Sequence, residues 1–453
     1  MKNIYLVHYS VKGIKTIDQL VSLSFYKKTF LNNPDTQNYN VKGIYGINGS
    51  GKSGIITSVD IFKNLLINPE YLNNPIVQKN LNEMINKKTE ELLIEAQYIV
   101  QLKSRLIFFK YGISLTREQT GKYVISHEEL SSKNATSKTD SMEPIFEVVN
   151  GEIVFIKEEK NTKLIDVFLK KTINLLSTTS MCALFYEKCI DYVKKNKSGG
   201  QSLFDSLTIL FLLGRKIHVY LDEADDHTNY LLYDSFGHLD NNSSLDYFVQ
   251  QVVQMNIDQL NIISVSNNVV PKESYGRFEK IVGKLCKFLQ IFKSDLLGIE
   301  IDKKVDHDVY VCSLVMVYNS YKIHAEFEST GIKKLIRLYA YLKEMAQGGI
   351  VFIDEFDSNL HDVYLCALLE YLMEYGEGQL CFTTHNVGPM DILRRNKKSI
   401  DFLSADHKIY SWTTNGNYSP SKLYRNGMIE GSPFNVDSID FIGVFSPEEE
   451  DEQ

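Results

Sequence analysis

The chain lacks the features that mark secreted, zinc-binding and membrane proteins. Its six cysteines include no pair with Cys-x-x-Cys spacing, and most lie in apolar runs, so we interpret them as free thiols of a reducing compartment. No run approaches 18 uninterrupted apolar residues, and residues 1–10 lack the charged-then-apolar layout of a signal peptide. We therefore expect a cytoplasmic protein with no membrane contact.

The chain also lacks an excess of positive charge. The formal net charge is −8, from 49 Lys and Arg against 57 Asp and Glu, so the chain as a whole has no strong electrostatic attraction for nucleic acid, which leaves a local basic groove open. One basic run, residues 394–398, is interpreted as a solvated helix end. With 9 prolines and 26 glycines extensive disorder is not expected, and 453 residues predict two or three subdomains.

One stretch, Gly46-Ile47-Asn48-Gly49-Ser50-Gly51-Lys52-Ser53, fills every position of the phosphate-binding P-loop pattern. It follows a strand-like run over 41–45 and precedes apolar residues with helical spacing. Glycines let backbone N–H groups turn toward phosphate oxygens, while the helix N-terminus and Lys52 add positive charge. The Ser53 hydroxyl is suited to Mg²⁺. We therefore expect a bound nucleoside triphosphate.

Two later strand patterns end in polar residues. The apolar run Gly349-Ile350-Val351-Phe352-Ile353 precedes Asp354 and Glu355, of which the first could hold Mg²⁺ and the second could polarise an attacking water. The run Leu380-Cys381-Phe382-Thr383-Thr384 ends at His385, which is placed to sense the γ-phosphate. A lone histidine is more often structural, but this context favours a site residue.

These residues, with Ser358-Asn359-Leu360-His361 between them, resemble the Walker B acids, D-loop and H-loop of ABC-type ATPases. Upstream, Glu328-Ser329-Thr330-Gly331-Ile332-Lys333-Lys334-Leu335 resembles the ABC signature, although Thr330 and Ile332 depart from its usual residues. The combination is similar to the SMC-like, OLD-related group of bacterial ATPases found in phage-defence operons. The similarity covers roughly residues 1–125 and 305–445.

The resemblance implies an α/β ABC-type head whose sheet is built from both chain ends, with ATP and Mg²⁺ as cofactors. The implied site residues are Asn48, Gly49, Ser50, Gly51, Lys52, Ser53, Ser329 and Gly331 for the nucleotide, Ser53 and Asp354 for Mg²⁺, and Glu355 and His385 for catalysis. It also implies a homodimer or higher homo-oligomer, because the signature of one subunit completes the site of another. An effector nuclease or toxin is the implied partner, and a phage protein or DNA is a further candidate.

Composition and periodicity predict four regions. We expect an N-terminal ATPase lobe over 1–127, a mainly helical insertion over 128–304, a C-terminal ATPase lobe over 305–445 and an acidic tail over 446–453. The polar stretch 128–141 is interpreted as a loop or hairpin extension at the first boundary. Gln97 and Gln101 are interpreted as surface strand residues rather than as Mg²⁺ contacts.

Other functions stay open at this point. An OLD-type nuclease would need a Toprim domain, for which the 68 residues after His385 (453 − 385) are too few. A DNA-repair or SMC-like clamp usually inserts long heptad coiled coils, which the sequence does not show, and a basic groove would favour that alternative. A transporter ATPase does not fit the long insertion and the variant signature. The acidic run Val219-Tyr220-Leu221-Asp222-Glu223-Ala224-Asp225 resembles a second Walker B strand, but we interpret it as a chance loop edge.

Overall fold

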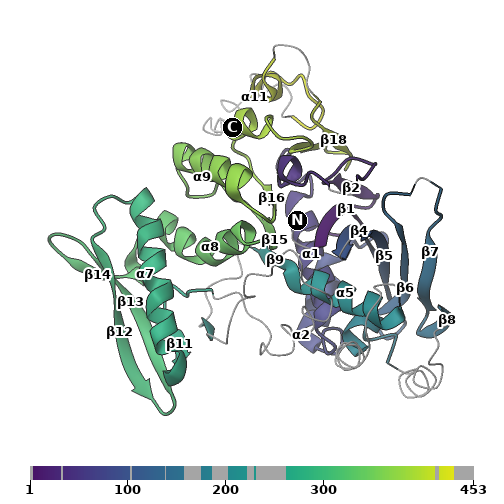
Figure 1. Cartoon of the computed structure of the whole chain (residues 1–453), viewed down its shortest axis with the longest axis horizontal. Coiled ribbons are helices and arrows are strands. Elements are labelled where there is room, and N and C mark those ends of the chain that lie inside the picture. Colours follow the sequence, from purple (N-terminus) through teal and green to yellow (C-terminus); the bar gives the residue numbers. More distant parts are fainter. Residues whose placement is uncertain are drawn as a thin grey trace, which may run out of the picture.

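The computed structural model describes residues 4–31, 34–102, 105–137, 139–157, 175–185, 202–221, 229–230, 262–413 and 418–432. These residues form three β-sheets with helices packed against them (Figure 1). Within these ranges, no helix has the length and apolar character needed to cross a membrane.

The central sheet is built from distant parts of the chain. Its strand order is β18-β17-β3-β16-β15-β9, and all neighbours are parallel except β18. The strands are β3 (Val41–Tyr45), β9 (Ile217–Tyr220), β15 (Ile350–Ile353), β16 (Gln379–Thr383), β17 (Ile400–Leu403) and β18 (Ile409–Ser411). The strands β3, β15, β16 and β17 are buried along their whole length, as parallel strands covered on both faces must be.

Alternate residues of this sheet enter two different cores. Phe352 and Cys381 pack in the core that contains α1 (Lys52–Ile67). Val351 and Phe382 pack in the core that contains α8 (Thr330–Ala346) and α9 (Asp362–Tyr375). Helices therefore cover both faces. They are α5 (Leu203–Lys216) with α1, and α8 (Thr330–Ala346), α9 (Asp362–Tyr375), α10 (Met390–Leu393) and α11 (Pro420–Arg425) on the other side.

An antiparallel sheet packs on the other side of α1. Its order is β2-β1-β4-β5-β6-β7-β8. The strands are β1 (Ile4–Lys12), β2 (Val21–Ser24), β4 (Glu91–Leu102), β5 (Arg105–Arg117), β6 (Tyr123–Asn134), β7 (Glu143–Val149) and β8 (Glu152–Ile156), with α2 (Pro75–Met84) beside β6. One face joins the α1 core, where Tyr9 Oη and Ser58 Oγ share a 2.9 Å hydrogen bond.

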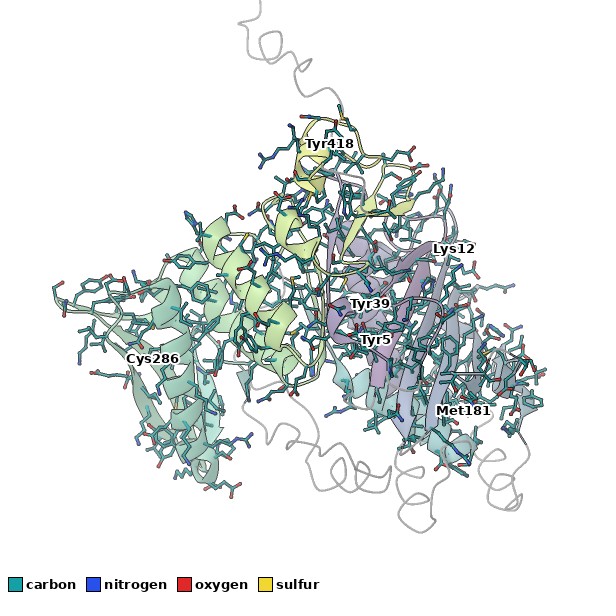
Figure 2. The ribbon with its side chains drawn as sticks, turned by 45° about the horizontal axis from the view of Figure 1, so that its top comes forward. Tyr5, Lys12, Tyr39, Met181, Cys286 and Tyr418 are labelled. Atoms are coloured by element: carbon teal, nitrogen blue, oxygen red, sulfur yellow. The ribbon has the colours of Figure 1, made fainter. Side chains whose placement is uncertain are left out.

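Long-range hydrogen bonds join the two sheets. The Gln379 side chain accepts from Leu6 N at 2.8 Å and donates to Leu6 O at 2.9 Å, so it extends β1 toward β16. Tyr5 Oη donates to Tyr39 O at 2.9 Å, where η1 (Gln37–Tyr39) leads into β3 (Figure 2). The N-terminal strands are thereby fixed against the sheet that carries the P-loop.

A third unit projects from the body and contains Cys286 (Figures 1 and 2). It consists of β10 (Asn229–Tyr230), β11 (Asn268–Pro271), η2 (Lys272–Ser274), α7 (Tyr275–Phe292), β12 (Gly298–Asp306), β13 (Val309–Val317), β14 (Lys322–His324) and η3 (Ala325–Phe327). Its core of α7 and sheet residues also includes Ile332, Leu335 and Ile336 from the start of α8. The helix α8 therefore packs in the core of this unit and in a core of the central sheet at once.

The expected α/β class and the sheet built from both chain ends are confirmed. The expected boundaries do not coincide with structural ones, because residue 128 lies inside β6 and residue 304 lies inside β12. Over 128–304, the described part contains the strands β7–β11 as well as the helices α5 and α7. The stretch 128–141 belongs to a hairpin, as one of the two interpretations expected, because residues 128–134 end β6 and β6 pairs antiparallel with β7.

The run over 219–221 is also more than a chance loop edge. Residues 217–220 form β9, which pairs in parallel with β15, and Asp354 N donates to Tyr220 O at 2.9 Å. Asp222, Glu223 and Asp225 lie outside the described residues, as do the acidic tail 446–453 and the start of the expected helical pattern near residue 164.

Candidate nucleotide-binding site

The P-loop connects β3 to α1, as the sequence predicts. Gly49 and Gly51 have φ values of 78° and 103°, a left-handed conformation that glycine adopts without the steric penalty of a side chain. Gly51 is the N-cap of α1, so the free N–H groups of the first helical turn point into the loop. Asn48 and Gly49 are exposed at its tip. The geometry is that of an anion-binding helix N-terminus.

Two side chains of the loop fit a triphosphate. Lys52 Nζ donates to Gly46 O and Ile47 O, both at 2.9 Å, so the ammonium lies within the curl of the loop. The Ser50 hydroxyl is buried and has no hydrogen-bond partner in the described residues. A phosphate oxygen at this position would supply an acceptor to both groups.

The carboxyl ends of β3, β16 and β15 place the predicted polar residues together. Burial lowers the pKa of Lys52, and the nearby carboxylates of Asp354, Glu355 and Asp357 oppose that shift. The same three carboxylates and Lys52 act on His385. The structure therefore gathers Lys52, Asp354, Glu355 and His385 at one edge of the sheet, where parallel α/β sheets bind ligands.

His385 is held in its neutral form near pH 7. Desolvation is the largest cause of the lowered pKa, and the positive charge of Lys52 adds to it, against the opposing carboxylates. A neutral imidazole can donate one hydrogen bond to a phosphate oxygen while it accepts another from water.

Thr383 organises the acidic end of β15. Its Oγ1 donates to Asp354 Oδ1 at 2.5 Å and accepts from Glu355 N at 2.8 Å. Thr383 is 1% exposed, whereas Asp354 is half-buried and Glu355 is exposed. One buried hydroxyl thus orients the expected Mg²⁺ ligand and fixes the backbone of the expected catalytic residue.

The Glu355 backbone is restrained from a second side. Its φ is 48°, an unusual conformation for a residue other than glycine and one that is often found at functional sites. The buried Lys334 side chain of α8 donates to Glu355 O at 2.5 Å and also to the Ser358 hydroxyl. The signature helix is therefore bonded directly to the Walker B and D-loop segments.

The signature residues lie against the D-loop rather than the P-loop. Thr330 Oγ1 donates to Asn359 Oδ1 at 3.3 Å, and a Cβ on Gly331 would lie 2.6 Å from Asn359 O. Ser329 caps α8 by accepting from Ile332 N at 3.4 Å, and it is exposed. No hydrogen bond of Ser329 among the described residues reaches residues 46–53. One chain thus brings together the Walker residues but does not add Ser329 and Gly331 to them.

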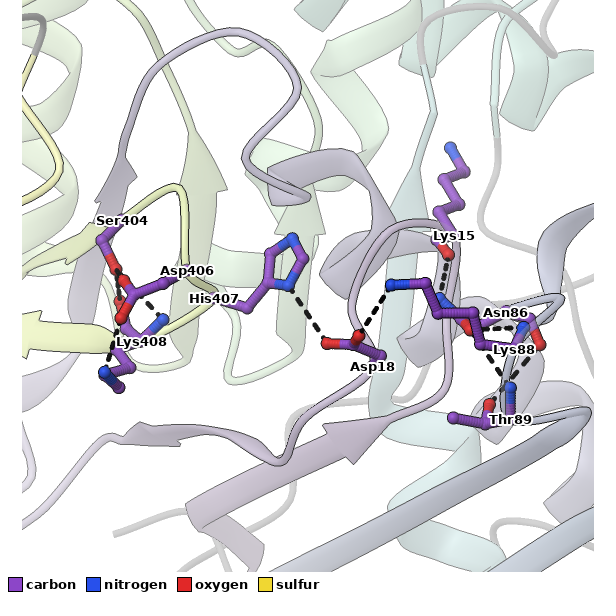
Figure 3. A network of polar contacts seen from close by, with 9 residues as sticks. All are labelled: Lys15, Asp18, Asn86, Lys88, Thr89, Ser404, Asp406, His407 and Lys408. Atoms are coloured by element: carbon purple, nitrogen blue, oxygen red, sulfur yellow. Dashed lines mark hydrogen bonds and ion pairs between the residues drawn. The ribbon is translucent and has the colours of Figure 1, made fainter.

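Two segments flank the P-loop and contact each other: the first loop contains Ile17 and Asp18, and the second contains Leu403 and His407. A Cβ on Gly51 would lie 2.7 Å from Ile17, and one on Gly46 would lie 2.5 Å from Leu403 O. Beyond these contacts, Asp18 lies 3.6 Å from His407 and 3.4 Å from Lys88 (Figure 3). The same network fixes the first loop through Asn86 Nδ2, which donates to the Lys15 carbonyl at 2.8 Å (Figure 3).

The residues present fit Mg²⁺ bound together with a nucleotide. Ser53, in the first turn of α1, and Asp354 are the two that would hold it. In the described part of the chain no group of three His, Cys, Asp or Glu side chains could hold a metal by itself. Mg²⁺ commonly uses one or two protein ligands plus phosphates and water, so this sparse donor set is suitable.

Sequence reasoning did not identify Thr383 and Lys334. Thr383 lies two residues before His385, and Lys334 follows Gly331 by three, so both lay inside recognised motifs. Their roles depend on contacts with Asp354, Glu355 and Ser358 from other elements. Sequence spacing alone carried no signal for those contacts.

Comparisons with known proteins match one part of the chain to a family. A family described as "AAA domain, putative AbiEii toxin, Type IV TA system" matches residues 222–391, a span that includes the signature, Walker B acids and His385 but not the P-loop. No curated protein matches the chain.

Two solved structures are similar to the chain at low identity. The first is the recombination mediator protein RecF bound to ATPrS, with 12% identity and a TM-score of 0.36; the match covers 91% of this chain and 99% of that one. The second is RecF bound to ATP, with 11% identity and a TM-score of 0.36; the match covers 90% of this chain and 99% of that one. At these scores the likeness supports no inference about activity or partners. The observed topology is that of an α/β fold with a P-loop between β3 and α1, and residues 222–391 of this fold match the AAA-domain family.

Proposed function

We propose that this protein binds and hydrolyses ATP with Mg²⁺ in sites completed between two copies of the chain. The observation that carries the proposal is that, within one chain, the signature residues lie apart from the P-loop and the Walker B acids. Lys52, Asp354, Glu355 and His385 converge at one sheet edge, whereas Ser329 and Gly331 lie on the D-loop without reaching the P-loop. A second copy is needed to bring a signature to each nucleotide.

Each residue has a role in this proposal. Lys52 and the loop N–H groups bind the phosphates, and Asp354 and Ser53 hold Mg²⁺, which neutralises charge on the phosphates. Glu355 orients the attacking water and accepts its proton, while neutral His385 contacts the terminal phosphate. The exposed Ser329 hydroxyl and the N-terminus of α8 approach the same phosphate from the partner.

Nucleotide state would then control association of the heads. Bound ATP joins two copies through its contacts with both, and hydrolysis removes the contact that the terminal phosphate made, so the copies separate. Lys334 gives this change a route to the projecting unit, because it bonds the Glu355 backbone to the helix that packs in that unit's core.

We further propose that this cycle holds or releases an effector nuclease or toxin in phage defence. The proposal rests on the resemblance of the motifs to ATPases of phage-defence operons and on the toxin–antitoxin description of the matching family. A phage protein or DNA would provide the trigger that shifts the nucleotide cycle.

A mixing experiment tests the shared site. Lys52→Ala removes a phosphate contact, and Ser329→Arg blocks the signature, so each variant alone should release almost no phosphate. In an equal mixture that exchanges freely, half of the dimers are mixed and each has one intact site, so about a quarter of wild-type turnover should return. No recovery, in a mixture shown by labelled subunits to exchange, would contradict the shared site. Full activity of Ser329→Arg alone would contradict it equally.

A further inference from the structure

A basic cavity lies on the face of the antiparallel sheet that is turned away from α1. Its volume is about 720 Å³, within the usual range of small-ligand sites. Strand residues His8, Gln97, Phe108 and Lys133 line its floor, and the segment after β2 forms one wall. The cavity is separate from the nucleotide site, since none of its lining residues belongs to the P-loop, the Walker B segment or the signature.

The charged side chains in the lining of this cavity are all lysines, and two carboxylates lie beside it, those of Glu95 and Glu129 at 2.8 and 3.7 Å from Lys110 Nζ. Five lysines line it, and neither aspartate nor glutamate does. Lys110 is paired with Glu95 at 2.8 Å, and Lys398 Nζ donates to Ser24 Oγ at 2.8 Å. For Lys27, Lys28 and Lys133 the described residues contain no ion-pair partner.

Burial lowers the pKa of Lys398; repulsion from Lys42 and Lys28 adds to this shift, and the carboxylate of Asp401, which is paired with Lys42, opposes it. Burial likewise lowers the pKa of His8, so the imidazole is neutral and can accept or donate a hydrogen bond. An anion in the cavity would relieve the repulsion between the lysines.

Aromatic rings form the apolar part of the lining. Phe30 and Phe108 are half-buried and lie with ring centroids 5.8 Å apart, and Tyr26 stacks on Phe30 at 5.5 Å with an interplanar angle of 6°. Lys133 Nζ lies 5.9 Å from the Phe108 ring centre, and Lys27 Nζ lies 5.9 Å from that of Tyr26. Two of the lysines in the lining therefore lie over aromatic rings of the same lining.

We propose that this cavity binds a nucleotide, either free or as part of a single nucleic-acid strand, with its phosphate on Lys27, Lys28 and Lys133 and its base against Phe30 and Phe108. Lysines paired with ring faces are the combination by which proteins bind single strands without reading sequence. A bare inorganic anion would use the lysines and leave the rings unused. The hydroxyl of Thr29, also in the lining, provides a further donor to phosphate oxygens.

The cavity is connected to the P-loop strand through the central sheet. Lys398 lies two residues before Ile400, the first residue of β17, and β17 pairs in parallel with β3, so Lys398 is at the opposite end of these strands from the P-loop. Asp401 of β17 forms a buried ion pair with Lys42 of β3 at 2.6 Å. The cavity wall and the P-loop thus share a rigid connection of two adjacent strands.

Fluorescence anisotropy with the full chain tests the inference. The probes are mant-AMP and a fluorescein-labelled oligo(dT) of about twelve nucleotides, a length within the range of single-strand sites. Lys27→Glu/Lys133→Glu should weaken binding of at least one probe by about tenfold or more. The matched control, Lys280→Glu/Lys304→Glu, makes the same charge change at exposed positions of α7 and β12 and should change binding by less than about twofold.

The two probes distinguish the sources of the nucleotide. Binding of mant-AMP assigns the cavity to a free nucleotide, whereas binding of oligo(dT) alone assigns it to a strand. Lys52→Ala should leave this binding unchanged, which separates the cavity from the ATP site and from the proposed ATPase function. If Lys27→Glu/Lys133→Glu unfolds, Lys27→Gln/Lys133→Gln provides the milder test.

Three results would overturn the inference. They are no binding of either probe by the wild type, equal weakening by the cavity variant and its control, and binding that depends on Lys52 but not on Lys27 and Lys133.

Discussion

Thr383→Val is the substitution whose effect follows most directly from the geometry. It removes the hydrogen bond to Asp354, which is worth about 1.5–3 kcal/mol because its acceptor is charged. It also leaves Glu355 N without its acceptor, at a cost of about 1–3 kcal/mol. Because Asp354 is only half-buried and Glu355 is exposed, water recovers part of both terms, and we expect a loss in unfolding free energy of about 2–4 kcal/mol.

The catalytic effect should exceed the effect on nucleotide binding. If the poorer placement of Glu355 raises the activation free energy of hydrolysis by about 1.4 kcal/mol, kcat falls about tenfold. The affinity for ATP should change less than about twofold, because Lys52 and the loop backbone are untouched.

Phosphate release and urea unfolding measure the two quantities, and Thr383→Ser is the matched control because it keeps the hydroxyl. A folded Thr383→Val protein with wild-type kcat would refute the positioning role. Equal losses of kcat in Thr383→Val and Thr383→Ser would also refute it, because Thr383→Ser retains the hydroxyl.

Three further changes have expected outcomes. Lys42→Met should lower the unfolding free energy measured in urea by about 3–5 kcal/mol, because it leaves the buried Asp401 carboxylate without its ion-pair partner. Lys42→Met/Asp401→Leu should recover most of this loss. Equal stability of the single and the double variant would contradict the prediction. Lys334→Met should reduce kcat with little change in ATP affinity, and Lys334→Arg should retain more turnover; a larger change in affinity than in kcat would assign Lys334 to binding. Burial raises the pKa of Glu128 to about 7, so its folded form binds more protons than its unfolded form between pH 4.5 and 7. Wild-type stability should therefore fall relative to Glu128→Gln by up to about 3 kcal/mol as the pH of urea titrations rises from 5 to 8, and a constant difference would refute this.

The sequence predicted those parts of the site that lie in continuous motifs. The P-loop between β3 and α1 and the strands before Asp354 and His385 occur where the apolar runs place them. The convergence of these three strand ends also followed, because parallel strands deliver their carboxyl ends to one sheet edge. The hydroxyl of Thr383 that joins them could not be inferred, since its partners are set by which strands are adjacent.

Long-range pairing explains what sequence reasoning missed. The stretch 128–141 was interpreted as a loop or hairpin extension, and its polar composition gave no sign that pairing with β5 and β7 makes residues 128–134 strand and buries Glu128 between Tyr111 Oη and Met181 N. The strand β9 was misjudged for the same reason, since its partner β15 is 130 residues later (350 − 220).

The basic cavity was equally hidden from sequence analysis. The basic run over 394–398 was interpreted as a solvated helix end. Arg395 fits this interpretation, because it is exposed and pairs with Glu370 at 2.7 Å on the surface. Lys398, however, turns into the cavity beside Lys28 and Lys133, which come from a distant part of the chain. Net charge says nothing about such a local concentration of lysines.

Sedimentation velocity of Glu355→Gln, with and without ATP and Mg²⁺, tests the central claim most directly. Glutamine keeps the backbone contacts to Thr383 and Lys334 but cannot accept the proton of the attacking water. The account predicts that ATP with Mg²⁺ converts this variant to a stable dimer or larger assembly and that phosphate release is lost. Unchanged sedimentation with phosphate release intact would contradict both the role of Glu355 and the site shared between copies.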